Sequence, residues 1–370
     1  MTNLDRPEGH PEIVELAREL ASEVLAPAAR TAEQQRAIPE EVWTTLFGTG
    51  LAVPVPEELG GDGVLGTLAE TVAVEQLAHG DPAITVGAFW SGAAALLLSR
   101  HGSPGQSDIV RGIDASWRGS VALYEGYGRA PAEYTTTVES AGGTVRVRGR
   151  KVAVPFATQA ADVIVVGVDP AGGGLRAAVV PATAPGLLVT PDAPGLALDA
   201  VPTATVDLDV ELDAAAVLGA GSADPVALAG SVERIRLIVA SALVGTATRA
   251  IEYAAVYARD RIAFGKPIAA FQGVSFLLAE AKMRTDAARL EIADVAARLD
   301  AGDVERGSAL VTGALAYAAS VATQATRDAV QVLGGHGFIT DHPVELWYRS
   351  AGALSVLDLD PLSSMFEPAL

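Results

Sequence analysis

The sequence predicts a mainly α-helical protein with a small β-barrel domain in the middle of the chain. Apolar residues recur at helical spacing through residues 1–118. Short β-branched runs separated by Gly, Pro and Asp fill residues 119–222, and long helical patterns with few breakers return over 223–370. We therefore expect an N-terminal helical domain, a β-barrel domain and a C-terminal helical bundle with these boundaries.

Helices are expected in the first region because EIVELARELASEVLAPAAR and LGTLAETVAVEQLAHG place apolar residues at i, i+3 and i+4. The turn VPVPEELGGDG at 53–63 separates them, since Pro and Gly break helices. In the middle region, four segments alternate or are β-branched, which predicts short strands joined by tight turns. They are TVRVRGRKVAVPF (144–156), ADVIVVGVD (161–169), LRAAVVPA (175–182) and ATVDLDVELD (204–213).

Three long helices are expected in the last region. The first runs from Pro225 to Asp260, and RIAFGKPIAAFQG then forms a turn because it contains Gly265 and Pro267. The second helix starts in VSFLLAEAKMR, and the third ends at Gln331. The glycines just past that end suit the left-handed conformation of a helix cap.

Composition excludes several classes of function. Lys and Arg number 26 against 45 Asp and Glu, a net charge of −19, which argues against nucleic-acid binding. The absence of cysteine excludes disulfides, thiolate catalysis and Cys-based metal sites, and the five histidines lack metal-ligand spacing, so no metal is expected. No uninterrupted apolar stretch is long enough for a membrane helix, and the N-terminus does not look like a signal peptide. We expect a soluble, cytoplasmic protein.

Two C-terminal segments carry a family resemblance. RIAFGKPIAAFQGVSFLLAEAKMR and QVLGGHGFITDHPVELWYRSA resemble two motifs of the acyl-CoA dehydrogenase family, and VPVPEELGGDG, VAVEQLAHGDPAI and GRKVAVPFATQAADVIVV resemble others, in the family's order. The resemblance implies a helical domain, a β domain and a four-helix-bundle domain. A nucleotide-binding bundle without a redox role is a weaker alternative, because the Gly-Gly turn lacks the preceding strand of phosphate-binding loops.

The resemblance also implies FAD bound between subunits, in dimers or dimers of dimers. In the family, the Arg-x-x-Phe-Gly turn and the Gln-x-x-Gly-Gly turn reach across the interface to the adenine-dinucleotide half of a neighbour's FAD. An arginine would pair with the pyrophosphate, a phenylalanine would offer an apolar face, glutamines would donate amide hydrogen bonds, and glycines would permit close approach. The corresponding residues here are Arg261, Phe264, Gln272, Gln331, Gly334 and Gly335.

The implied chemistry needs a carboxylate that removes the α-proton of an acyl thioester while flavin accepts the β-hydrogen as hydride. The resemblance places this base on Glu233, in SVERIRLIVASALVG, or on Asp358, in LDLD, depending on the branch of the family. We favour Glu233 and keep Asp358 as the alternative. A structural role is open for Glu233 as well, because acids are favoured near helix starts.

The middle domain departs from the family at two flavin-facing segments. Tyr124-Glu125-Gly126 replaces Thr-Glu-Pro, and the Gly-Ser-Asp that follows in the family is missing. The family's Trp-Ile-Thr falls on Ala153-Val154-Pro155, and proline has no amide hydrogen to offer a flavin. The contacts to a neighbour's FAD are thus kept, and those to the chain's own flavin ring are not. This pattern resembles the heteromeric bacterial branch that acts on steroid side-chain CoA thioesters.

The function implied is FAD-dependent α,β-dehydrogenation of an acyl-CoA, either by a homo-oligomer or by one subunit of a heteromeric enzyme. The family's usual electron acceptor is an electron-transfer flavoprotein. Two alternatives stay open: a flavin-dependent monooxygenase on the same fold, and a non-catalytic subunit that completes another chain's FAD site.

Overall fold

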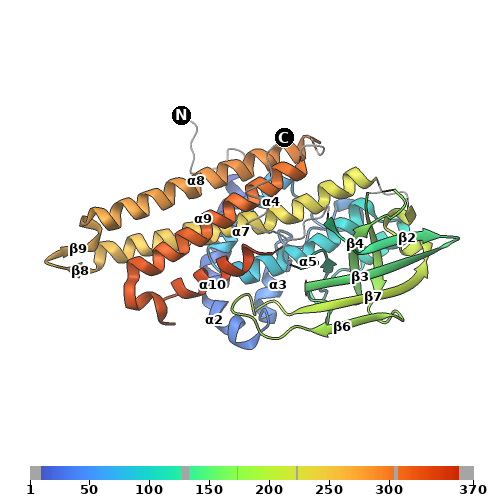
Figure 1. Ribbon diagram of the computed structural model, residues 1–370, viewed down its shortest axis with the longest axis horizontal. Helices are drawn as coiled ribbons and strands as arrows, with labels where there is room; N and C mark the ends of the chain where they lie inside the picture. Colours follow the sequence, from blue (N-terminus) through green and yellow to red (C-terminus); the bar gives the residue numbers. More distant parts are fainter. Residues whose placement is uncertain (1–9, 127–132, 173, 222–223, 304–306, 358–370) are drawn as a thin grey trace.

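The computed structural model describes residues 10–126, 133–172, 174–221, 224–303 and 307–357. The long helices α7, α8 and α9 run along the length of the molecule, with the β8–β9 turn at one end and the large sheet at the other (Figure 1). Helices α4 and α5 pack against this bundle. The expected order of helices, sheet and helices is confirmed.

The N-terminal region is helical, as expected. Helix α5 begins where Asp81 accepts a hydrogen bond from the Ile84 amide at 2.7 Å, with Pro82 in the first turn. By length and composition α5 could cross a membrane, but it is buried inside the protein as a core helix. The helices are α1 (Pro11–Leu20), which continues through a π-helical turn (Ala21–Leu25) into α2 (Ala26–Gln35), then α3 (Glu40–Gly48), α4 (Thr67–Ala78), α5 (Pro82–His101) and α6 (Pro104–Arg111).

The middle of the chain forms a curled, half-barrel sheet with its own apolar core. The strand path β1-β4-β2-β3-β7-β6, with β5 on β4, does not close on itself among the described residues, so the sheet is more open than a complete barrel. Most pairs are antiparallel, while β1 and β2 pair with β4 in parallel. The strands are β1 (Ser120–Ala122), β2 (Thr137–Ala141), β3 (Thr144–Pro155), β4 (Asp162–Val168), β5 (Leu175–Pro181), β6 (Leu187–Pro191) and β7 (Thr203–Asp213).

The four expected strands correspond to β3, β4, β5 and β7 and are confirmed within two residues at each end. Strands β1, β2 and β6 were not expected. They span three to five residues each, too few to produce a readable alternation.

The C-terminal bundle consists of α7 (Pro225–Asp260), α8 (Gln272–Asp300), α9 (Gly307–Leu333) and α10 (Val344–Leu354), with β8 (Ile262–Ala263) and β9 (Lys266–Pro267) in the turn after α7. The expected limits of α7 are confirmed, and α9 continues two residues past Gln331. The domain boundaries at 118 and 222 stay predictions.

Two glycines let neighbouring backbone approach a helix closely in the core. A Cβ at Gly92 of α5 would lie 1.8 Å from the Ala52 carbonyl oxygen, and one at Gly245 of α7 would lie 2.2 Å from the Glu75 carbonyl oxygen. We expect Gly92→Ala to lower the free energy of unfolding by about 3 kcal/mol or more, because backbone must move to admit the methyl group. Urea unfolding checks this. Gly352→Ala in α10, where the added Cβ meets nothing within 4 Å, is the control and should be neutral or stabilising.

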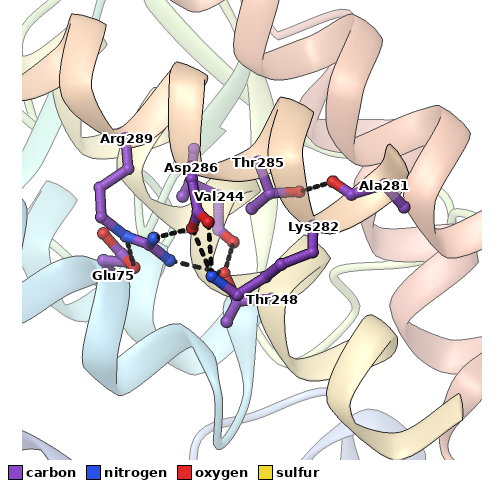
Figure 2. A network of polar contacts seen from close by, with 8 residues as sticks. All are labelled: Glu75, Val244, Thr248, Ala281, Lys282, Thr285, Asp286 and Arg289. Carbon is purple, nitrogen blue, oxygen red and sulfur yellow. Dashed lines mark hydrogen bonds and ion pairs between the residues drawn. The ribbon is translucent and has the colours of Figure 1, made fainter. Parts of the chain in front are cut away.

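A partly buried polar network ties α4 and α7 to α8 (Figure 2). Arg289 donates through Nε to Glu75 at 2.7 Å and through Nη2 to Thr248 at 3.0 Å, and it also pairs with Asp286. Lys282 reaches the same Asp286 carboxylate at 2.6 Å. Burial raises the pKa of Glu75 despite the nearby Arg289 guanidinium. The network satisfies its charges within the bundle, so we interpret it as structural.

The buried cap of α5 predicts a pH effect on stability. Burial raises the pKa of Asp81 from 3.8 to about 6, so the folded state holds this proton more tightly than the unfolded state. The resulting stabilisation is complete below about pH 4 and is lost as the pH rises through about 6. Between pH 4 and 7 the natural protein should therefore lose on the order of 2–3 kcal/mol of its free energy of unfolding. Asp81→Asn keeps the capping oxygen but cannot ionise, so its unfolding curves should not show this loss. Asp224→Asn, at the exposed cap of α7, should retain it.

Candidate functional site

The Arg261 turn and the Gly-Gly turn meet at the end of the bundle farthest from the large sheet. Arg261 follows the last residue of α7, and Gly334 follows the last residue of α9. Gly334 has φ +59°, the left-handed cap expected for it. Arg261 and His336 line one hollow of about 350 Å³, together with Tyr253, Val256, Tyr257 and Asp260.

The predicted dinucleotide contacts are open to a partner. Phe264 is 95% exposed and has φ +52°, an unusual backbone conformation for a bulky residue. Gln272 and Gln331 are exposed, and a Cβ at Gly335 would meet nothing within 4 Å. The structure therefore brings the six predicted residues to one accessible corner of the bundle, which we call the clasp. Their contact with FAD stays a prediction.

Four aromatic and imidazole side chains behind the clasp were missed from the sequence. The Tyr257 hydroxyl lies 2.9 Å from Nδ1 of His336, and the Tyr253 hydroxyl lies 2.7 Å from Nδ1 of His342. The two imidazoles stack with their centroids 5.4 Å apart. The sequence did contain a pattern that could have identified them. The two tyrosines are spaced i, i+4 just before Arg261 and so share one helix face, and His336 follows Gly335 directly. These contacts hold the two turns of the clasp together.

Glu233 lies inside the bundle, two turns after the start of α7, and is 3% exposed. Its carboxylate accepts a hydrogen bond from Nη1 of Arg236 at 2.9 Å, and the same nitrogen donates to Thr312 of α9 at 3.1 Å. Glu233 is a buried carboxylate with a cationic partner, which is compatible with a base and equally with a structural ion pair. The alternative base, Asp358, lies outside the described residues.

A cavity of about 830 Å³ lies beside the same part of α7. Arg234, 2% exposed, borders it, and its Nε donates to Glu70 at 2.6 Å. Glu233 is not among the described lining residues. These are Thr67, Arg100, His101, Gly102, Ser103, Pro104, Gly219, Asp224, Ala227, Gly230, Ser231, Arg234, Leu299 and Asp300.

The middle-domain segments that depart from the family are engaged in contacts within the chain. Glu125 pairs with Lys151 at 2.9 Å, with both side chains almost fully buried. The Pro155 carbonyl accepts the Ser120 hydroxyl at 2.7 Å. Next to it, Phe156 is buried with φ +57°, and its ring packs edge-on against Trp43 at 5.7 Å. A large ring held in a strained backbone conformation fills this junction between the sheet and the N-terminal helices.

No cluster of three or more His, Asp or Glu side chains suited to a metal ion occurs in the part of the chain that the structure describes.

Comparison with known proteins shows what this architecture is similar to. Family models for the acyl-CoA dehydrogenase N-terminal and C-terminal domains match residues 7–109 and 226–358. The probable acyl-CoA dehydrogenase FadE25 of Mycobacterium tuberculosis is 30% identical over 356 residues, covering 93% of this chain and 90% of its own length. The human mitochondrial short-chain specific acyl-CoA dehydrogenase is 30% identical over 363 residues, which cover 94% of this chain and 86% of its own length. A glutaryl-CoA dehydrogenase of Mycobacterium smegmatis, solved in complex with FADH2, superposes with a TM-score of 0.84 at 19% identity, covering 98% of this chain and 94% of its own.

Proposed function

Because this chain belongs to the acyl-CoA dehydrogenase family, an oxidoreductase family that acts on CH–CH groups, we propose that it takes part in FAD-dependent oxidation of the α,β bond of an acyl-CoA thioester. FAD would accept the β-hydrogen as hydride when bound. In a homo-oligomer, the chain would supply the clasp to a neighbour's dinucleotide and Glu233 as the group that removes the α-proton at its own flavin. In a heteromer, it would supply the clasp to the second chain's dinucleotide, and the base would come from that second chain. The site of action proposed is the cytoplasm, with an electron-transfer flavoprotein as the acceptor.

The position of the clasp carries this proposal. Helix α7 has 36 residues and is therefore about 54 Å long, with the sheet near its start and the clasp at its end. A flavin cradled by the sheet of one chain could not reach the clasp of the same chain. The clasp is therefore suited to a dinucleotide held mainly by a second chain, as expected for an oligomer.

The departures in the middle domain bear on the identity of that second chain. Glu125 and Pro155, at the positions where the resemblance implies flavin contacts, are instead bonded within their own chain, to Lys151 and Ser120. This favours a heteromeric assembly, in which a different chain cradles the flavin ring, over a homo-oligomer with rebuilt contacts.

Purification alone and after co-expression with the products of neighbouring genes tests the proposal. We expect a flavin spectrum and reduction of an artificial electron acceptor by acyl-CoA in at least one preparation. One flavin per chain in the protein alone indicates a homo-oligomer, and flavin only in the mixed complex indicates a heteromer. Flavin with oxygen consumption and no thioester oxidation would favour the monooxygenase instead. Absence of flavin from both preparations would contradict the proposal.

An exposed apolar stripe on α8 supports assembly. Phe276, Met283 and Leu290 recur every seven residues and are 65%, 65% and 45% exposed. Such a spacing forms one seam along a helix, suited to packing against a helix of another chain. We expect Met283→Glu with Leu290→Glu to lower the mass measured by light scattering. Leu188→Glu with Leu196→Glu, at exposed leucines of the sheet domain, is the control and should leave the mass unchanged.

A further inference from the structure

The segment that follows the Gly-Gly turn is held from two sides. It spans residues 339–343, between the turn and α10. From α7, the Tyr253 hydroxyl lies 2.7 Å from Nδ1 of His342. From α2, Nη2 of Arg30 donates to the carbonyl oxygens of His342 at 3.4 Å and Thr340 at 3.5 Å, and each bond is long because one nitrogen serves two acceptors. His342 is therefore anchored through its ring by α7 and through its backbone by a helix at the other end of the chain.

The Arg30 side chain belongs to a closed ring of four alternating charges. Its Nη1 pairs with Glu33 at 3.0 Å, and Glu33 pairs in turn with Nη2 of Arg349 at 2.6 Å. Nε of Arg349 pairs with Glu345 at 2.8 Å, and Glu345 also pairs with Arg30. The four side chains are 15–29% exposed, so they are partly shielded from solvent. A single surface pair contributes little, but a closed network holds the Arg30 guanidinium in one place.

The His342 ring transmits this placement to the clasp. It stacks on His336 with the centroids 5.4 Å apart and the planes inclined by 15°, and it meets Tyr257 edge-on at 6.0 Å. His336 lines the hollow beside Arg261, whereas His342 is not among the described residues that line it. A shift of His342 would therefore move a wall of the hollow without removing a group that a ligand touches.

The Gly-Gly turn needs an anchor of this kind. Gly334 has φ +59°, and a Cβ at Gly334 or Gly335 would meet nothing within 4 Å, so their surroundings do not confine these two residues. Glycine loses more conformational freedom on ordering than any other residue. A ligand that had to order the turn itself would bind more weakly by that cost. Contacts that order the turn beforehand therefore strengthen binding.

We propose that Arg30 and His342 are positioning residues of the clasp, which hold the His336 ring and the Gly-Gly turn beside Arg261 before the dinucleotide binds. The inference rests on the proposed function, because the ligand of the clasp is the FAD of that proposal. Neither Arg30 nor His342 lines the hollow, so both act through His336 and the turn. The affinity of the clasp for FAD then depends on how α2 is docked against α10.

The dissociation constant of added FAD is measured on the FAD-binding assembly, either the chain alone or its co-expressed complex, together with unfolding in urea. Arg30→Gln should bind FAD about 3- to 10-fold more weakly, an effect of about one hydrogen bond. His342→Phe keeps a ring for the stack but loses the bond to Tyr253, and it should weaken FAD binding to a similar degree. The kcat at saturating FAD should stay unchanged in both variants, because neither residue touches a reacting group.

Arg349→Gln is the matched control. Like Arg30, Arg349 pairs with Glu33 and Glu345, but its third contact is with the Leu196 carbonyl and not with the segment 339–343. It should lower the free energy of unfolding about as much as Arg30→Gln and leave the dissociation constant of FAD unchanged.

A second test asks whether Arg30 acts through the His336 ring. In a His336→Ala background, Arg30→Gln should weaken FAD binding less than it does in the natural chain, because the ring that Arg30 positions is gone. Additive effects of the two substitutions would contradict the inference.

Equal weakening of FAD binding by Arg30→Gln and Arg349→Gln would also overturn it, since α2 would then have loosened as a whole. If Arg30→Gln and His342→Phe both bind FAD like the natural chain, while Arg261→Gln does not, this inference alone fails. If FAD binding is independent of Arg261 too, the clasp and that part of the proposed function fail with it.

Discussion

Arg261→Gln should lose most of the bound FAD and, with it, thioester oxidation. Arg261 lies at the exposed end of α7 and lines the hollow that it shares with His336. Under the proposed function, it would pair there with the pyrophosphate of an FAD held by a second chain. A charge-assisted pair of this kind contributes about 1.5–3 kcal/mol, so FAD should bind about 10- to 150-fold more weakly. The flavin-to-protein ratio after gel filtration and the dissociation constant of added FAD are the measurements. Arg259→Gln, two residues earlier on α7, is the control and should keep its flavin.

If the protein is a homo-oligomer, mixing two inactive variants tests whether the clasp acts on a neighbour's FAD. Arg261→Gln chains keep Glu233, and Glu233→Gln chains keep the clasp. If the clasp acts on a neighbour's FAD, a dimer that contains one chain of each variant has one complete site and one site that lacks both groups. About half of the dimers in a random mixture are of this mixed kind, so the mixture should recover about a quarter of the natural activity. No recovery from a mixture with proven subunit exchange would place the clasp and the base in the same chain's site.

The parts of the fold that follow from periodicity could be predicted from the sequence. Helix α7 was expected from Pro225 to Asp260 and has those limits, because a proline follows its capping Asp224 and few breakers occur within it. Strand β1 could not be found, since three residues carry no period and its parallel partner β4 lies about 40 residues later in the chain. Sheet curvature and the open strand path depend on such distant pairings.

Candidate site residues could be proposed from the sequence where several of them lie together in one short segment. The two turns of the clasp each carry their arginine, glutamine or glycines within a few residues, so the sequence alone could propose them, and the fold places Arg261 in one hollow with His336 of the Gly-Gly turn. Their role in binding FAD stays a prediction. The cavity beside α7 is different. Arg100, Ser231 and Asp300 come from three helices far apart in sequence, and none belongs to a recognisable pattern. The contacts of Arg236 with Glu233 and with Thr312 of α9 were equally invisible, because they depend on how α7 faces α9.

Glu233→Gln should also have a large effect. It separates a catalytic role of this carboxylate from a structural one. Loss of the carboxylate breaks a buried pair with Arg236 and should lower the free energy of unfolding by about 3–5 kcal/mol, although the amide retains some hydrogen bonding. If Glu233 removes the α-proton, kcat should also fall about 10²- to 10⁴-fold in the protein that remains folded. Unfolding curves and single-turnover flavin reduction at saturating acyl-CoA measure the two effects separately.

Glu75→Gln is the matched control for that variant. Glu75 is also buried in the bundle, and it pairs with Arg289 at 2.7 Å in the network of Figure 2, away from the cavity beside α7. Its loss should destabilise the protein to a similar degree and leave flavin reduction intact in the folded fraction. If both variants lose stability and both keep their rate of flavin reduction, Glu233 is a structural partner of Arg236 and not the base. The base would then have to come from elsewhere, either from Asp358 of this chain or from a different subunit.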